Sequence, residues 1–272
     1  MPFMASFPIY PRPGPLLAAR KHSQFVPGLA LSPCDGHAGG VADNQPAPAN
    51  ANGPTDEGAD DIDDAAPSTS PSDFAALLAL AGVEEELALR SRVGFLAFHG
   101  GNLERMTDEI ASVAAVRSDS SLYAVRQPAG MRHHLASNRV TPAASPLLAE
   151  FLDHVDVAIA IHGYGRDGLW TTLLLGGSNR PFAAQVGAAL RVALPEFEVL
   201  DELSSIPRDL AGQHPNNPVN KPRFGGVQIE LPPRIRGLTP HSAAMPRENG
   251  RIGWTNDLIA ALATAAASWR PN

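Results

Sequence analysis

From Phe74 to the C-terminus, short continuous apolar runs alternate with amphipathic stretches. The apolar runs predict strands over 93–98, 121–126, 156–161, 171–175, 197–200 and 226–231. The stretches between them predict helices over 74–81, 103–115, 147–154, 181–194 and 256–269. Strands that alternate with helices indicate a single α/β domain with a mostly parallel mixed sheet flanked by helices.

Residues 1–72 show no such pattern. They contain twelve of the 26 prolines and no run with clear helical or strand periodicity. Residues 37–72 hold seven Asp and Glu residues but no Lys or Arg. A segment with so few large apolar groups cannot offset the entropy cost of ordering. We therefore expect a disordered Pro/Ala/acidic leader over 1–72 and one folded domain over 73–272.

Charge and composition narrow the range of partners. The net charge of −7 equals the excess in residues 37–72, so the rest of the chain is close to neutral. A nucleic-acid binder usually shows a basic excess, so no nucleic-acid partner is expected. No stretch approaches the roughly 18 apolar residues of a membrane span, so no membrane partner is expected. Prolines interrupt the N-terminal apolar stretch, which disfavours a signal peptide and predicts a cytoplasmic protein.

Two predicted strands end in histidine. His99 follows the run 93–98 and precedes a glycine pair, and His162 follows the run 157–161. In open α/β sheets, ligands bind beyond the carboxyl ends of the strands. Glu104 lies one turn beyond His99, and the only cysteine is Cys34, in the leader. Two histidines and one carboxylate form a set that catalytic zinc favours, with a position left for water.

Glu230 lies inside the last apolar run, where an ionised carboxylate is costly unless it is paired or linked to a metal. It fits a general base that takes a proton from water and passes it to a leaving amine. Each residue alone has a structural interpretation. A single histidine at a strand end is often structural, Glu104 could interact with a helix dipole, and Glu230 could pair with Arg234 or Arg236. The combination favours a metal site.

Candidate substrate contacts are less specific. Arg166, Arg180 and Arg223 follow strand ends or precede the last strand. Any of them could pair with a substrate carboxylate in the forked geometry of guanidinium, or lie solvated at the surface. We select Arg166 and Arg223, together with His134 of the tandem His133-His134, as substrate-binding candidates. His134 also has a purely structural alternative.

Five segments carry a resemblance to a known family. In order, they read FHGGNLERMTDEIA, HHLAS, AIHGYGRDGLWTTLLLGG, HPNNPVN and FGGVQIELPPRIR. Together they resemble the poly-γ-glutamate hydrolase family, over roughly Phe74 to Leu238. The resemblance implies a zinc carboxypeptidase-like fold, with zinc on His99, Glu104 and His162 and with Glu230 as general base. Ala136 and Met106 stand where the family often has threonine and glycine, which leaves the substrate open.

These observations lead to one hypothesis with two alternatives. The leading hypothesis is a zinc-dependent amidohydrolase that acts on a γ-glutamyl bond in poly-γ-glutamate or on a smaller acylated amino acid. One alternative is a phage-associated DNA-transaction protein, because some family members carry the label of phage-related replication protein; the charge balance disfavours it. The other is a metal-binding module without catalysis. The sequence does not predict the oligomeric state.

Overall fold

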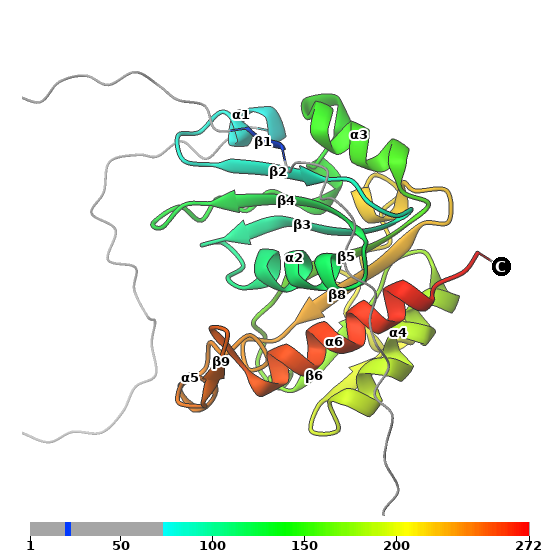
Figure 1. Ribbon diagram of the computed structural model, residues 1–272. Coiled ribbons are helices and arrows are strands. Elements are labelled where there is room, and N and C mark those ends of the chain that lie inside the picture. The colour runs from blue at the N-terminus through cyan, green and yellow to red at the C-terminus, as the bar shows by residue number, and fades with distance from the viewer. Residues whose placement is uncertain (1–19, 23–72, 272) are drawn as a thin grey trace, which may run out of the picture. The chain divides into compact units, whose positions relative to one another are not determined.

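The computed structural model describes residues 20–22 and 73–271, all within one compact unit (Figure 1). The predicted leader therefore lies outside the described residues, except for one short strand. The strands of the main sheet are β1 (Arg20–His22), β2 (Glu84–Ala88), β3 (Val93–Gly101), β4 (Ser121–Gln127), β5 (Val157–Gly163), β6 (Thr172–Leu175), β7 (Glu198–Leu200) and β8 (Gly226–Leu231). Their order is β1-β2-β4-β3-β5-β8-β6-β7.

The four central strands of the sheet are parallel, and the next strand on each side of them runs in the opposite direction. Strands β4, β3, β5 and β8 run in the same direction. Strand β2 is antiparallel to β4, and β6 is antiparallel to β8. The structure thus confirms the predicted α/β fold with a mixed, mostly parallel sheet. A separate two-stranded ribbon consists of β9 (Arg247–Glu248) and β10 (Arg251–Ile252).

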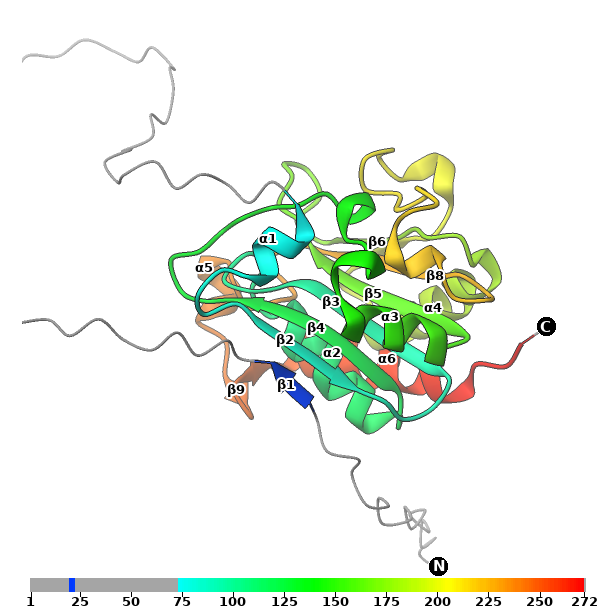
Figure 2. The same ribbon diagram turned by 90° about the horizontal axis from the view of Figure 1, so that it is seen from above.

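Helices cover both faces of the sheet (Figures 1 and 2). One face carries α2 (Thr107–Arg117), α4 (Arg180–Ala193) and α6 (Gly253–Ser268), and the other carries α1 (Phe74–Leu78) and α3 (Pro146–His154). The remaining helical turns are α5 (Pro240–Ala243) and 3₁₀ turns at 137–139, 142–144, 203–205 and 218–220. None of the helices in the described part of the chain is long and apolar enough to cross a bilayer.

Strand β3 explains why the central runs lack alternation. Phe95 and Ala97 pack with the helices on one face, whereas Leu96 and Phe98 pack with those on the other. A parallel strand that is buried on both faces reads as a continuous apolar run. The strand therefore carries His99, at its carboxyl end, into the interior.

The connection after β3 differs from the prediction. The sequence predicts a helix from 103, capped by Asn102, but α2 begins at Thr107 and its N-cap is Met106. Strand β3 instead continues through the glycine pair, with a register shift against β4 between Ala97 and Gly100. Gly101 has φ 70°, and a Cβ there would lie 2.2 Å from the Gln127 carbonyl oxygen. This close approach needs glycine and delays the start of the helix.

Candidate metal centre

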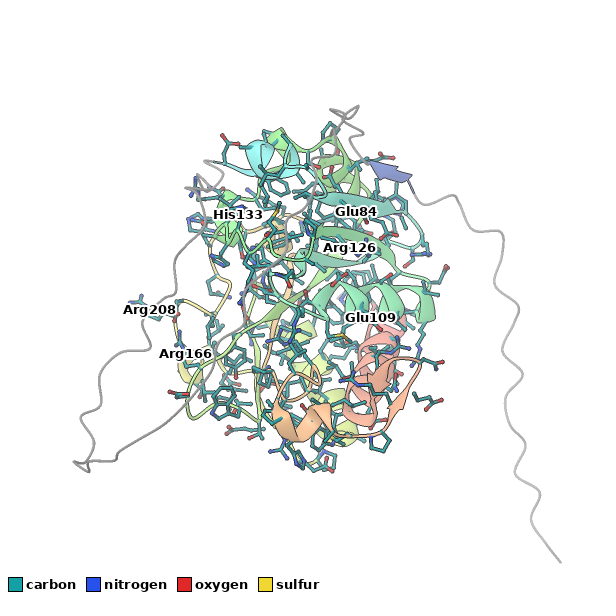
Figure 3. All side chains as sticks on the ribbon, turned by 90° about the vertical axis from the view of Figure 1, so that its left-hand side faces the viewer. Glu84, Glu109, Arg126, His133, Arg166 and Arg208 are labelled. Atoms are coloured by element: carbon teal, nitrogen blue, oxygen red, sulfur yellow. The ribbon has the colours of Figure 1, made fainter. Side chains whose placement is uncertain are left out.

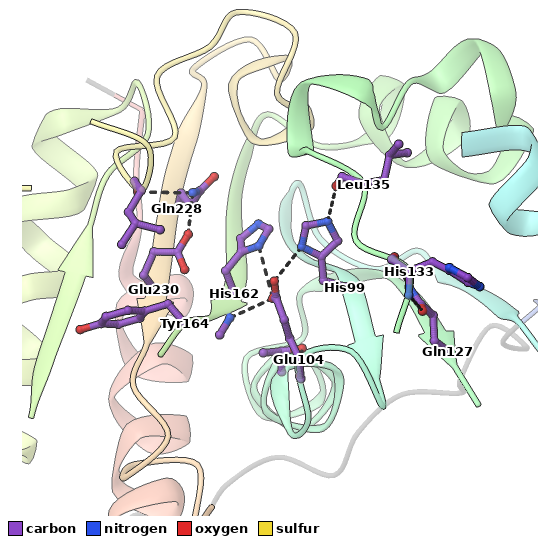
Figure 4. A network of polar contacts seen from close by, with 12 residues as sticks. His99, Glu104, Gln127, His133, Leu135, His162, Tyr164, Gln228 and Glu230 are labelled. Atoms are coloured by element: carbon purple, nitrogen blue, oxygen red, sulfur yellow. Dashed lines mark hydrogen bonds and ion pairs between the residues drawn. The ribbon is translucent and has the colours of Figure 1, made fainter. Parts of the chain in front are cut away.

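Three predicted site residues lie at the carboxyl ends of adjacent parallel strands (Figure 4). His99 is on β3, His162 on β5 and Glu230 on β8. The register of β5 and β8 places His162 directly opposite Glu230. All three side chains belong to buried residues, with 2%, 3% and 4% of their surface exposed. The sheet therefore holds two imidazoles and a carboxyl group in a sheltered position.

Glu104 reaches the same point from the connection between β3 and α2. Its Oε1 lies 2.8 Å from His99 Nδ1, and its Oε2 lies 3.4 Å from His162 Nδ1. The backbone N–H of Gly163 donates to Oε2 at 2.9 Å. One potential ligand atom from each of His99, Glu104 and His162 lies within 4.8 Å of the others. The structure thus brings the predicted metal ligands together.

The turn that carries Glu104 is fixed from both ends. The Glu104 backbone N–H donates to the His99 carbonyl oxygen at 3.0 Å. Asp108 accepts from the Gly101 N–H at 3.1 Å and from Arg126 at 2.7 Å. These bonds set the direction from which the carboxylate approaches the histidines.

The donor atoms fit a cation. His99 Nε2 lies 2.8 Å from the Leu135 carbonyl oxygen, which can only accept, so Nε2 carries the proton. A neutral His99 then turns the lone pair of Nδ1 toward a carboxylate oxygen. Two such atoms repel unless a proton or a metal ion lies between them. The buried Nε2 of His162 has no hydrogen-bond partner among the described residues.

The pKa shifts of Glu104 and His162 also indicate a site that favours a cation. Burial alone would raise the pKa of Glu104, but the adjacent His99 and His162 hold it far below its usual range. Burial alone would lower the pKa of His162, yet Glu104 and then Glu230 raise it. The cluster therefore stabilises positive charge at its centre, which a bound divalent ion would supply.

Glu230 has a different environment. Burial raises its pKa to about 7, because the stabilising effect of His162 only partly offsets the lost solvation. Gln228 Nε2 donates to Glu230 Oε1 at 2.8 Å, and Asn217 Nδ2 donates to Gln228 Oε1 at 2.7 Å. A carboxyl group that titrates near neutrality and has a fixed orientation suits a general base.

Comparison with known proteins identifies the family. A model of the family described as poly-gamma-glutamate hydrolase matches residues 81–249, more than half of the chain. The chain belongs to the poly-gamma-glutamate hydrolase family. It is therefore a hydrolase, and the matched residues include the whole cluster described above. No curated protein matches the sequence.

Two of the matching solved structures share the fold of this family member, and a third matches it less closely. A bacteriophage poly-gamma-glutamate hydrolase is 21% identical, with a TM-score of 0.57 over 68% of this chain and 88% of that chain. A structure named "YNDL-apo (Zinc-free)" is 20% identical, with a TM-score of 0.54 over 74% of this chain and 93% of that one. A putative carboxypeptidase from Burkholderia mallei aligns more loosely, with 12% identity, a TM-score of 0.38 and coverage of 67% and 58%.

A cavity of about 570 Å³ lies in front of the cluster in this hydrolase. His99, Glu104, His162 and Glu230 line it, as does the candidate substrate contact His134. The His134 ring centre lies 4.9 Å from that of His99. Burial, and then the neighbouring His99, lower the pKa of His134 below its usual value, which favours the neutral ring.

The candidate arginines lie elsewhere. Arg166 pairs with Asp209 at 2.5 Å; Asp209 lines the cavity and Arg166 does not. Figure 3 shows Arg166 at the same edge of the molecule as Arg208, which also lines the cavity. Arg223 lies over the Phe224 ring, 5.0 Å from its centre, and does not line the cavity. Arg180, by contrast, donates to the backbone carbonyls of Leu175, Gly177 and Asp201.

Sequence reasoning missed the groups that support Glu230. Gln228 lies two positions earlier on β8, so its side chain shares a face with that of Glu230. This spacing of two residues within an apolar run is the local signal that indicates the contact. Asn217 comes from the loop before β8, and no local signal indicates that it reaches Gln228.

Proposed function

We propose that this family member is a zinc-dependent amidohydrolase that cleaves γ-glutamyl amide bonds in poly-γ-glutamate or in a related acylated amino acid. The observation that carries the proposal is the convergence of His99, Glu104 and His162 on one point, with Glu230 lining the same cavity. The family match supports the substrate class.

The donor set favours zinc over harder ions. Two imidazole nitrogens and one carboxylate form a set typical of catalytic zinc, whereas magnesium and calcium prefer all-oxygen sites. When bound there, zinc would polarise the amide carbonyl and lower the pKa of a water molecule. The bond from His99 Nε2 to the Leu135 carbonyl holds that ring in position, a contact that commonly tunes metal-binding histidines.

Glu230 moves the proton in this scheme. As a carboxylate it takes a proton from the attacking water, and as an acid it delivers that proton to the leaving amine. Because its pKa is about 7, neither transfer is strongly unfavourable near neutral pH. Gln228 holds Oε1 of Glu230, which fixes the orientation of the carboxyl group during both transfers.

The proposal includes the three substrate contacts inferred from the sequence, and their positions relative to the cavity support them to different degrees. His134 lines the cavity, and its neutral ring can exchange a hydrogen bond with an amide. Arg166 lies next to the cavity through Asp209, which supports a contact with an anionic group at the rim. Arg223 has no comparable support.

The test combines metal analysis with an assay of glutamate release from poly-γ-glutamate and from N-acyl glutamates. We expect about one zinc per chain. Glu230→Gln should retain the zinc and lose activity by roughly 10²- to 10⁴-fold, whereas the exposed Glu150→Gln should match the wild type. A metal-free preparation with full activity would refute the proposal. A zinc-loaded chain that is as inactive as Glu230→Gln on both substrates would favour a metal-binding module without catalysis.

A further inference from the structure

A second cavity adjoins the candidate metal centre. Its volume is about 440 Å³, and Leu103, Glu104, Gly163 and Tyr164 line both it and the first cavity. Three arginines line the second cavity, whereas its only acidic residue is Glu104. The arginines are Arg105, Arg132 and Arg236. They come from three separate segments: the connection after β3, the loop after β4 and the segment after β8.

Arg236 is buried, and no acidic residue that the structure describes forms an ion pair with it. Only 6% of its surface is exposed. Its Nη1 donates to the Arg105 carbonyl oxygen and its Nη2 to the Tyr164 carbonyl oxygen, both at 3.1 Å. Its Nε has no hydrogen-bond partner within the described ranges. Burial lowers the pKa of Arg236 to about 10 despite the attraction of Glu104 and Glu230. A buried cation with so little compensation is costly, and an anion beside it would offset that cost.

Gly163 is the residue that brings Arg236 next to the candidate metal centre. A Cβ at Gly163 would lie 2.5 Å from Arg236 Nη1. The backbone N–H of the same glycine donates to Glu104. Gly163 therefore contacts two groups. Its N–H donates to the candidate metal ligand Glu104, and its lack of a side chain leaves room for the Arg236 guanidinium. The positive charge of Arg236 is therefore separated from the candidate metal ligand Glu104 by Gly163 alone.

The other two arginines of the second cavity lie at the surface. Arg105 and Arg132 are exposed, and neither forms an ion pair with any residue that the structure describes. Five arginines elsewhere do pair with acids: Arg92, Arg126, Arg166, Arg191 and Arg251. The cavity thus gathers positive charge that the described part of the chain does not neutralise. Guanidinium groups bind carboxylates with paired, charge-assisted hydrogen bonds.

We propose that Arg105, Arg132 and Arg236 form a carboxylate-binding subsite that holds an acidic group of the substrate beside the bond to be cleaved. The inference rests on the proposed function, because it assigns the bound carboxylate to the substrate. The subsite lies across Glu104 from the cavity that contains Glu230. A substrate that spans both cavities therefore presents its amide to the cluster and an acidic group to the arginines.

Direct binding tests the subsite apart from catalysis. The full-length His99→Ala variant, which should not hold the metal, is titrated calorimetrically with glutarate, its uncharged isostere glutaramide and inorganic phosphate. Glutarate should bind, and glutaramide should bind at least about tenfold more weakly, since one charge-assisted contact is worth about that factor. Adding Arg132→Gln or Arg105→Gln should weaken glutarate binding by a similar factor. Arg117→Gln, an exposed arginine at the far end of α2, should leave it unchanged.

Kinetics then link the subsite to the substrate. In the otherwise wild-type chain, Arg132→Gln should raise KM for an acidic substrate about tenfold and leave kcat within about twofold, with no change for the matching amidated substrate. Glutarate binding that is unaffected by both arginine changes, equal binding of glutaramide, or tighter binding of phosphate than of glutarate would overturn the subsite. If the wild type hydrolysed no γ-glutamyl amide while glutarate binding followed the arginines, the proposed function would fail and the anion site would stand.

Discussion

The two cavities on either side of Glu104 are built on opposite principles. Around the metal cluster, polar groups are held by other groups of the chain: His99 by the Leu135 carbonyl, and Glu230 by Gln228 and Asn217. In the second cavity, Arg236 donates to two backbone carbonyls, but neither it nor the exposed Arg105 and Arg132 pairs with an acid that the structure describes. Groups that take part in chemistry gain from fixed orientation before the substrate arrives, whereas a cation that binds a charged ligand keeps that capacity only if no acid of the chain neutralises its charge.

The largest effect should come from removing a candidate metal ligand. His99→Ala deletes one donor of the cluster and exposes Glu104 to water. Loss of the metal would remove several kcal/mol of transition-state stabilisation, or on the order of 10³-fold in kcat. Elemental analysis and an amidase assay on the same preparation measure both consequences. His154→Ala, on α3, serves as the control. An active His99→Ala protein with bound metal would contradict the assignment of the first cavity as a metal centre.

The next largest effect is on pH dependence. The base form of Glu230 is its carboxylate, and its pKa of about 7 means that this form is lost as the pH falls below neutrality. The value of kcat/KM should therefore fall by about 50-fold between pH 7 and pH 5, with a slope that approaches about tenfold per pH unit at the acid end. Zinc content measured at each pH separates this effect from loss of the metal. A flat profile across this range would exclude Glu230 as the base.

A smaller effect should follow from loosening the support of Glu230. Gln228→Met removes the N–H that stabilises the carboxylate at Oε1, so the pKa of Glu230 should rise. The acid limb of the kcat/KM profile should shift to higher pH, and kcat should drop by about 10- to 100-fold, as for supporting contacts in metal sites. Gln185→Met, on α4 and outside the cavity, is the matched control. A lower kcat with an unshifted limb would show that Gln228 is only structural.

The smallest effect should come from Arg166. Its pair with Asp209 is exposed, with 42% and 64% of the two side chains accessible. Such pairs contribute at most about 1 kcal/mol to stability. Arg166 is already paired with Asp209 and does not line the cavity, so Arg166→Gln should change KM for an acidic substrate by less than about threefold, against about tenfold for Arg132→Gln. Michaelis–Menten measurements on both variants rank the two arginines, and the opposite ranking would place the main anion contact at the rim.

The sequence predicted the framework of the site because its signals are local. The apolar runs that become β3, β5 and β8 each end near His99, His162 or Glu230, and parallel strands bring such ends together. The sequence predicts a helix at Glu104, whereas β3 continues through Gly101. The close approach of Gly101 to the Gln127 carbonyl involves another strand, so it leaves no local signal. The position of Glu104 could be inferred, but not its conformation.

Other features have no local signal at all. Strand β2 reads as polar, since it begins with three glutamates, yet Glu85 is buried and accepts hydrogen bonds from Tyr123 and Ser145. The three arginines of the second cavity lie in segments more than 20 residues apart. Their meeting depends on the complete topology of the sheet, which periodicity does not specify.

X-ray diffraction from the zinc-loaded protein, recorded on both sides of the zinc absorption edge, tests the central claim most directly. The account predicts one anomalous peak, about 2.0 to 2.2 Å from a nitrogen of His99, a nitrogen of His162 and an oxygen of Glu104, with Glu230 facing it and not bound. A peak at any other residues, or no peak in a fully active preparation, would contradict it.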